Sequence, residues 1–287
     1  MSVGTNFNPR RFHKSQLKFY LFLGPFAVFM ALPIVYIFST AFKPIDELFA
    51  FPPRFFVRRP TIENFRDIFS FVEYGLPVAR YFMNSVIVTL FVVGLSVLLS
   101  TMAGYVLSKK TFKGQKFIFE VNKIALMFVA VAVTIPRFLV ISNIGIIDTM
   151  AAHVLPMIAI PVGLFLVKQF IDQVPDELID AAKVDGAGDV YILSKIVFPL
   201  VRPAVATIAI LSFQATWNNT VTSTIYVNDE LKQTFAFYMS TLTNISNSVA
   251  AAGLGAAATL IMFVPNLVIF MFLQSKVMNT MAHSGLK

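Results

Sequence analysis

The sequence predicts an all-α, polytopic membrane protein with six transmembrane helices, cytoplasmic N- and C-termini and a cytoplasmic helix-turn-helix loop. Of its 287 residues, 57% are hydrophobic and only 13% are charged, which is too little polar surface to cover a water-soluble globule. Six apolar runs reach the roughly 20 residues that a helix needs to cross the hydrocarbon of a bilayer. A charged segment between the fourth and fifth runs carries the start and stop signals of two short helices. We therefore expect a multi-pass protein of the plasma or inner membrane.

The six expected spans follow the apolar runs in order. They cover residues 19–42, 81–107, 117–141, 150–170, 203–226 and 249–273. The first run is too long for a signal-peptide core and leads into "FKPIDE", without a small-residue cleavage site, so we expect it to remain as a span. Prolines remove backbone donors and predict kinks more readily than hinges within these spans. They are Pro25, Pro33, Pro136, Pro156, Pro161 and Pro265.

The distribution of basic residues predicts the orientation. With the N-terminus inside, 15 of the 23 Lys and Arg residues lie in inner segments and 8 in outer ones, as the positive-inside rule requires. The outer loop 43–80, with six basic residues, runs against this trend. The expected organisation is a cytoplasmic segment 1–18, a six-span domain 19–275 with an inner loop 171–202, and a cytoplasmic tail 276–287.

The inner loop has the pattern of a helical hairpin. Acidic residues at its start favour a helix N-terminus, a proline suits the first turn, an Asp-Gly pair predicts a turn, an aspartate can cap the second helix and a proline ends it. These residues are Asp176, Glu177, Asp180, Pro175, Asp185, Gly186, Asp189 and Pro199. Leu178, Ala181 and Ala182 form a shallow face. From the residues alone, a hairpin that fits the groove of another protein and an ordinary solvated hairpin are equally good interpretations.

The spacing within this hairpin resembles a family motif. Asp180-Ala181-Ala182 is followed after three residues by Gly186, and after nine more by Ile196, Phe198 and Pro199. This is similar to the EAA loop of binding-protein-dependent ABC importers, and the stretches "AFKPIDELFAFPP" and "LFLVKQFIDQVPDELIDAA" resemble carbohydrate-type permeases related to the maltose transporter's smaller membrane subunit. The resemblance covers roughly residues 17–275. It departs from the family at Asp180, where Glu is usual, and in the tail "QSKVMNTMAHSGLK", which lacks the common glycine-rich ending.

The resemblance implies a function and a set of partners. The chain would be the permease subunit of an ATP-driven importer of a sugar or oligosaccharide, working with a homologous second permease, two ATP-binding-cassette ATPase subunits and an extracytoplasmic solute-binding protein. The hairpin would dock on an ATPase subunit. The implied coupling residues are Asp180, Ala181, Ala182, Asp185, Gly186, Ile196 and Pro199. The polar loop 227–248 would lie outside, under the solute-binding protein.

Several classes of function are excluded or disfavoured. The chain has no phosphate-binding G-x-x-x-x-G-K-[ST] loop, so ATP and Mg²⁺ would be used by partner subunits and no cofactor is expected on this chain. It has no cysteine, and neither a metal-ligand cluster nor a Ser, His and Asp arrangement stands out, so we expect a transport subunit rather than an enzyme. Its basic residues flank apolar runs, which argues against nucleic acid despite a net charge of +8. His153 is expected to be a hydrogen-bonded packing residue.

Two alternative functions remain at this stage. One is an ABC importer for another polar solute. The other, from a different class, is a secondary carrier that acts without ATP; such carriers usually keep ionisable groups deep in their spans. Here Glu120, Arg137 and Asp148 lie toward span ends, and the middles of the spans hold no carboxylate.

The fifth span is unusually polar, and it supplies the candidate translocation path. Ser212, Thr216, Asn219 and Ser223 recur at helical spacing and so are expected to share one face, flanked by Gln214, Trp217 and Asn218. Such side chains could line a hydrophilic pathway or hydrogen-bond to other helices, and the residues favour neither interpretation. The sixth span begins with "SVAAAGLGAAATL", whose small residues predict close helix packing rather than solute binding.

Overall fold

The computed structural model describes residues 17–70, 77–245 and 252–284, and within these ranges the chain is helical and contains no strand. The predicted all-α class is therefore confirmed, whereas most of the predicted N-terminal segment lies outside the described residues. The helices, in chain order, are α1 (Leu17–Ala41), α2 (Ile45–Leu48), α3 (Glu63–Ser70), α4 (Val78–Lys109), α5 (Gln115–Ala125), α6 (Thr134–Asn143), α7 (Ala151–Ile158), α8 (Pro161–Asp172), α9 (Asp176–Val184), α10 (Asp189–Tyr191), the π-helical η3 (Ile192–Val197), α11 (Phe198–Leu200), α12 (Arg202–Trp217), α13 (Val221–Tyr226), the 3₁₀ turn η4 (Glu230–Lys232), α14 (Phe235–Ile245) and α15 (Ala252–Ser284).

Three of the described helices are long and apolar enough to cross a membrane: α1, α4 and the Ala252–Gln274 part of α15. Two further pairs meet these criteria if each bent pair counts as one span. The pair α7 and α8 is bent by 43°, and the helix Asp189–Leu200 meets α12 at 85°. The structure thus provides between three and five membrane-crossing elements by length and composition, and the predicted six spans and cytoplasmic termini remain predictions.

The third predicted span, residues 117–141, does not form one continuous helix in the structure. The chain forms α5, then a series of turns, then α6. Pro136 lies in the first turn of α6, where its missing N–H needs no partner. In an uninterrupted helix the same proline would leave the carbonyl of Ala132 without its backbone donor and would clash with it.

The fourth and fifth predicted spans are also interrupted. Pro161 is the first residue of α8 and follows the break that separates α8 from α7, so the prediction of a proline kink is confirmed there. The fifth span ends as a helix at Trp217 and restarts as α13 at Val221. Residues beyond Trp217 therefore do not continue the face of α12.

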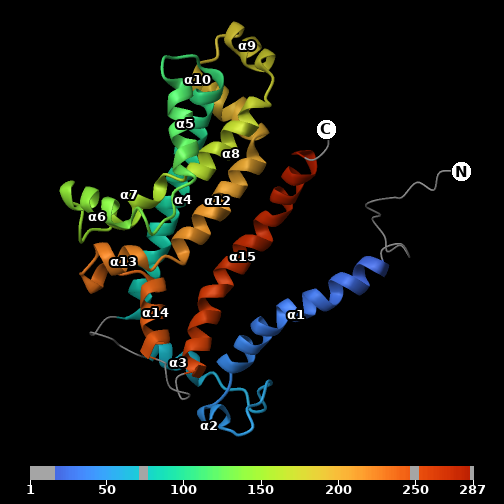
Figure 1. Cartoon of the computed structure of the whole chain (residues 1–287), viewed down its shortest axis with the longest axis vertical. Coiled ribbons are helices and arrows are strands. Elements are labelled where there is room, and N and C mark those ends of the chain that lie inside the picture. The colour runs from blue at the N-terminus through green and yellow to red at the C-terminus, as the bar shows by residue number, and fades with distance from the viewer. Residues whose placement is uncertain (1–16, 71–76, 246–251, 285–287) are drawn as a thin grey trace, which may run out of the picture.

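The helices pack into a bundle whose two ends differ (Figure 1). α4 lies against both α8 and α12, while α15 packs on α12, α14 and α1. The hairpin of α9 and α10 occupies one end, and α2, α3 and α14 gather at the other (Figure 1). Glycines permit the closest approach: a Cβ added at Gly104 of α4 would lie 3.0 Å from the Val167 side chain of α8. The predicted close packing of the sixth span is confirmed within this chain, since Ala257 and Ala258 are fully buried.

The segment 227–245 differs from the predicted polar loop. α14 buries Phe235, Tyr238 and Leu242 in a core shared with α3, α4 and α15, and the ring of Tyr238 stacks on Tyr81 at 4.8 Å between centroids. Residues 246–248 of the predicted loop lie outside the described residues. The segment is amphipathic, and its apolar half belongs to the core rather than to the solvent.

The loop 43–80, which is predicted to lie outside against the positive-inside trend, neutralises part of its own charge. Lys43 is buried and donates to the carbonyl of Arg54 at 2.5 Å. Arg59 pairs with both Asp46 and Glu47. Backbone N–H groups of Arg58 and Arg59 donate to the Glu47 carboxylate, and the first of these bonds holds the pKa of that carboxyl below its usual value. These basic residues therefore stabilise the local fold of the loop, and their number says little about which side of the membrane the loop occupies.

Candidate functional site

The first helix of the hairpin ends in a left-handed glycine turn. Gly186 has φ of 81°, as the sequence predicts for the Asp-Gly turn pair. Its N–H donates to the carbonyl of Lys183 at 3.0 Å, and the N–H of Ala187 donates to the carbonyl of Ala182 at 2.9 Å. This pair of bonds is a Schellman motif, which satisfies the last carbonyls of α9 and reverses the chain.

The second helix of the hairpin runs from α10 through η3 into α11. The predicted cap at Asp189 is wrong: Gly188 holds the N-cap position, and Asp189 accepts bonds from Lys110 and Tyr105 of α4 instead. The helix widens into a π-helical turn just before Pro199, which cannot donate a backbone hydrogen bond. It ends one residue after that proline, at Leu200, before the 85° bend into α12.

The predicted shallow face of the hairpin is divided between two sides. Ile179 and Ala182 point into the chain and pack in a core with Ile192, Val197 and residues of α4, α8 and α12. Leu178 and Ala181, the other two residues of the predicted face, are exposed. One side of α9 therefore holds the hairpin on the bundle, and the other is free to contact a partner.

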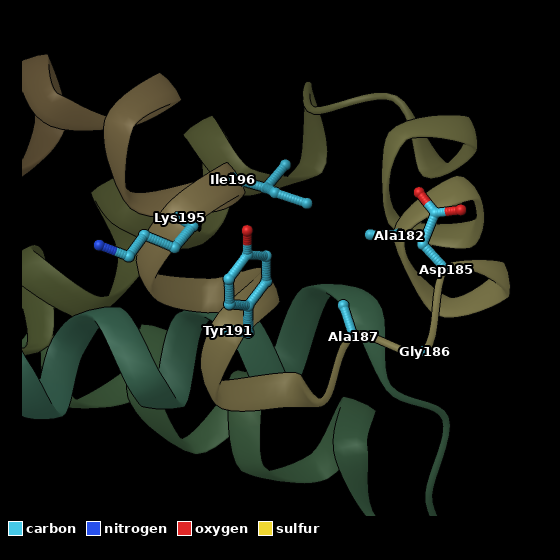
Figure 2. Close-up of a pocket in the computed structure, with 7 residues that line it drawn as sticks. All are labelled: Ala182, Asp185, Gly186, Ala187, Tyr191, Lys195 and Ile196. Carbon is cyan, nitrogen blue, oxygen red and sulfur yellow. The ribbon is translucent and has the colours of Figure 1, made fainter.

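A pocket of about 470 Å³ lies inside the hairpin, and Figure 2 shows the side chains around it. It is lined by Ala182, Asp185, Gly186, Ala187, Tyr191, Lys195 and Ile196. The fold thus brings together four of the seven predicted coupling residues. The other three, Asp180, Ala181 and Pro199, lie outside the lining. The Lys195 side chain extends away from the Asp185 carboxylate (Figure 2), so the two charges do not close the pocket.

Two lysines at the end of α4 hold the hairpin. Lys109 donates to Asp176 at 2.7 Å and to the carbonyl of Val174 at 2.6 Å, and Lys110 donates to Asp189 at 2.6 Å. These hydrogen bonds hold the pKa of both aspartates below the usual value. In the sequence the two lysines counted only as orientation signals, and no local pattern links them to aspartates more than 60 positions away.

The candidate path residues do not form one stripe. Ser212 and Thr216 are buried, and within the described residues their hydroxyls have no hydrogen-bond partner. Trp217 is buried as well; it stacks on Phe213 and donates its Nε1–H to the carbonyl of Met262 at 3.3 Å. The flat face of the Trp217 ring is therefore covered in this structure.

Of the remaining candidate path residues, two are hydrogen-bonded inside the bundle and two are exposed. Asn219 accepts bonds from the backbone and hydroxyl of Thr222, and Ser223 pairs with Thr234. Gln214 and Asn218 are exposed. Asn218 exchanges amide hydrogen bonds with Asn266 of α15, at 3.3 and 3.1 Å. Asn266 was missed because a single asparagine in an apolar run gives no periodic signal.

His153 of α7 is fully buried and contacts α13 and η4. Its Nδ1 lies 2.8 Å from the Thr222 hydroxyl, and its Nε2 lies 3.1 Å from the carbonyl of Lys232. The predicted hydrogen-bonded packing role is confirmed. In the ranges that the structure describes, no three His, Asp or Glu side chains are grouped as metal ligands would be.

Taken together, the fold and the hairpin define a helical membrane protein with a folded, charged projection at one end of its bundle. The model of the family described as the binding-protein-dependent transport system inner membrane component matches residues 2–275. The chain belongs to this family. It is therefore a multi-pass membrane transport subunit.

Similar proteins span nearly the whole chain. The arabinooligosaccharides transport system permease protein AraQ of Halalkalibacterium halodurans is 31% identical over 275 residues, which cover 93% of this chain and 94% of that protein. The galactooligosaccharides transport system permease protein GanQ of Bacillus subtilis is 27% identical over 272 residues, covering 93% and 94%. A chain of a bacterial ABC transporter involved in the import of the acidic polysaccharide alginate has the same fold, with a TM-score of 0.78 at 21% identity over 93% of this chain and 99% of that one.

Proposed function

We propose that this chain is a membrane permease subunit of an ATP-driven ABC importer that translocates a sugar or oligosaccharide delivered by an external solute-binding protein. The observation that carries the proposal is the hairpin, whose family-like spacing coincides with an exposed Schellman turn and a concave pocket. The family and the oligosaccharide permeases named above support the substrate class.

The hairpin is proposed to dock on an ATPase subunit through its exposed side. Ala181 and Asp185 are exposed, and Val184 and Val190, 88% and 82% exposed, flank the turn. Exposed valines beside a polar turn are well suited to enter a groove on a partner, because their apolar surface gains most from being covered.

The proposed topology has six spans with both termini in the cytoplasm. The basic-residue distribution supports it. The arrangement of the bundle agrees: α1 ends beside α2, and α15 starts near α3 and runs back toward the half that holds α9, so the outer ends of both helices point away from the α2 and α3 end (Figure 1). Placing the hairpin inside then puts the α2 and α14 end outside, where the solute-binding protein would meet it.

A second permease subunit is proposed to complete the translocation path. The cavity of about 250 Å³ between α4, α12 and α15 is lined by apolar side chains apart from Thr89, so a sugar has few partners there. The exposed amides of Gln214 and Asn218 instead line an open face. A hydrophilic solute could use these amides only if another subunit covered them from lipid.

The decisive experiment is uptake into vesicles that contain this chain with its partner subunits and the solute-binding protein. Candidate solutes are first chosen by their thermal stabilisation of that binding protein across a glycan panel. Uptake that requires ATP on the hairpin side is expected. Uptake that proceeds without ATP would establish a secondary carrier, and stabilisation only by a non-sugar solute would establish an importer for another class of substrate.

A further inference from the structure

The end of α4 contacts both helices of the hairpin, each at its first residue. Lys109 pairs with Asp176, where α9 begins, and Lys110 pairs with Asp189, where α10 begins. The hydroxyl of Tyr105, one turn back along α4, donates to the same Asp189 at 3.3 Å. These two points of attachment add to the packing of the hairpin on the bundle and fix both of its helix starts relative to the end of α4.

The two lysines are held differently. The Lys109 side chain is only 7% exposed, and its ammonium has two oxygen partners, so it is fixed by packing as well as by charge. The pair of Lys110 and Asp189 is more open to solvent. Exposed ion pairs of this kind contribute little to folding stability, so the second pair can be removed without unfolding the hairpin.

The opposite end of α4 is attached to the segment that contains η4 and the start of α14. Asn84 donates to the carbonyls of Leu231 and Gln233, both at 2.9 Å. The Ser85 hydroxyl accepts the N–H of Phe235 at 2.8 Å. Side chains of one helix therefore hold the hairpin at one end and this segment at the other.

We propose that α4 is the rigid connector between these two ends, with Lys109 and Lys110 as the positioning residues that hold the hairpin on it. The inference rests on the ATP-driven import proposed above. α4 is one uninterrupted helix of 32 residues, about 48 Å long, with no internal proline. The paths through α7 and α8 and through α12 are broken by bends of 43° and 85°. A displacement of the hairpin is therefore transmitted to the opposite end more directly through α4 than through either bent path.

The first test removes the charges of the connector. We expect Lys109→Met combined with Lys110→Gln to retain the ATPase subunits on purification, yet to lower the stimulation of ATP hydrolysis by loaded solute-binding protein about five- to tenfold, the lower part of the range for coupling between sites. Lys123→Gln is the matched control, because Lys123 pairs with Glu120 inside α5 and links no two elements. Unchanged stimulation in the double variant would overturn the proposal.

The second test replaces the ion pair by a covalent link. The chain contains no cysteine, so Lys110→Cys with Asp189→Cys creates a single reactive pair. The uncrosslinked variant should show lowered stimulation, and a short bismaleimide should restore both stimulation and uptake, because α4 and the hairpin move as one body. If the crosslink abolishes uptake, the hairpin must move relative to α4 and the connector role is refuted.

The two proposals fail in different ways. Absence of ATP-dependent uptake in the unmodified protein would contradict the proposed function itself. Normal uptake in the unmodified protein, combined with a crosslinked variant that stays inactive, would contradict only the role of α4. Loss of ATPase co-purification in the Lys109 and Lys110 variant would assign the lysines to docking and would equally refute a positioning role.

Discussion

Gly186 is the residue of the hairpin whose backbone conformation restricts substitution most. Its φ of 81° lies in the left-handed region, where a side chain costs roughly 1–2 kcal/mol and a β-branched one more. Two residues on, Gly188 has φ of −79° and no atom within 4 Å of an added Cβ. The two glycines of one turn therefore differ in what they tolerate.

We expect Gly186→Val to misalign the hairpin, weaken ATPase docking and abolish ATP-driven uptake while the membrane helices remain inserted. Gly188→Val is the control and should retain most of the activity, because its backbone suits any residue. The comparison requires ATPase co-purification and stimulated hydrolysis for each variant. Normal hydrolysis and uptake in Gly186→Val would mean that the hairpin is only a solvated loop.

Gly253, near the start of α15, is constrained by space rather than by its backbone. A Cβ there would lie 2.7–3.0 Å from the side chain of Asn64, which is held by bonds to the carbonyls of Ala41 and Lys43. We expect Gly253→Ala to destabilise the fold by about 1–3 kcal/mol through overpacking. Gly94→Ala has open space and should be neutral or stabilising. Thermal unfolding in detergent measures both, and equal melting temperatures would show that Asn64 moves aside freely.

At the scale of elements, the hairpin has one face packed on the bundle and another that is exposed. Ala182 is buried against the bundle, while Ala181 faces outward. We expect Ala182→Trp to loosen the hairpin itself, seen as faster proteolysis within residues 176–200. Ala181→Trp should leave proteolysis unchanged and still prevent ATPase co-purification, because the added ring blocks the outer face. If Ala181→Trp co-purifies normally, the docking face lies elsewhere.

The end of α12 likewise places a buried residue, Trp217, next to an exposed one, Asn218. Trp217→Ala removes a ring buried in the core, and we expect a loss of about 3–5 kcal/mol in stability and poor assembly. Asn218→Leu should leave the fold intact, because the amide of Asn266 keeps its bond to the carbonyl of Met262, and yet reduce uptake. Melting temperature and uptake measured on both variants distinguish packing from transport. Full uptake in Asn218→Leu would remove this face from the path.

At the scale of the whole molecule, the two ends of the bundle should face opposite sides of the membrane. Single cysteines introduced at Val184 and Asn228, both exposed, are the only thiols in each variant. A membrane-impermeant maleimide should label Val184→Cys only from the cytoplasm and Asn228→Cys only from outside. Labelling of both from one side would contradict the topology.

Much of the fold and of the hairpin could be predicted because the signals are local. The length of an apolar run predicts whether a helix can cross a bilayer, and α1 and α4 match the predicted spans closely. The Asp185-Gly186 pair predicts a turn because only a few residues adopt its backbone angles. Signals of this kind act over a few residues and can be read locally, although Asp189, predicted as a cap, bonds to Lys110 and Tyr105 of a distant segment instead.

What the sequence alone determined is the class of the protein: a membrane-embedded helical chain, with a charged hairpin and without a nucleotide-binding loop. The tertiary structure decided which faces are covered. It put Trp217 in the core and Asn218 on the surface, ended α12 between them, and brought Lys109 and Lys110 to aspartates more than 60 positions away. The free energy of transferring a side chain from water to an apolar environment depends on the residue type, so it can be assigned from the sequence. Burial and charge pairing depend on which helices meet, which is a property of the assembled bundle.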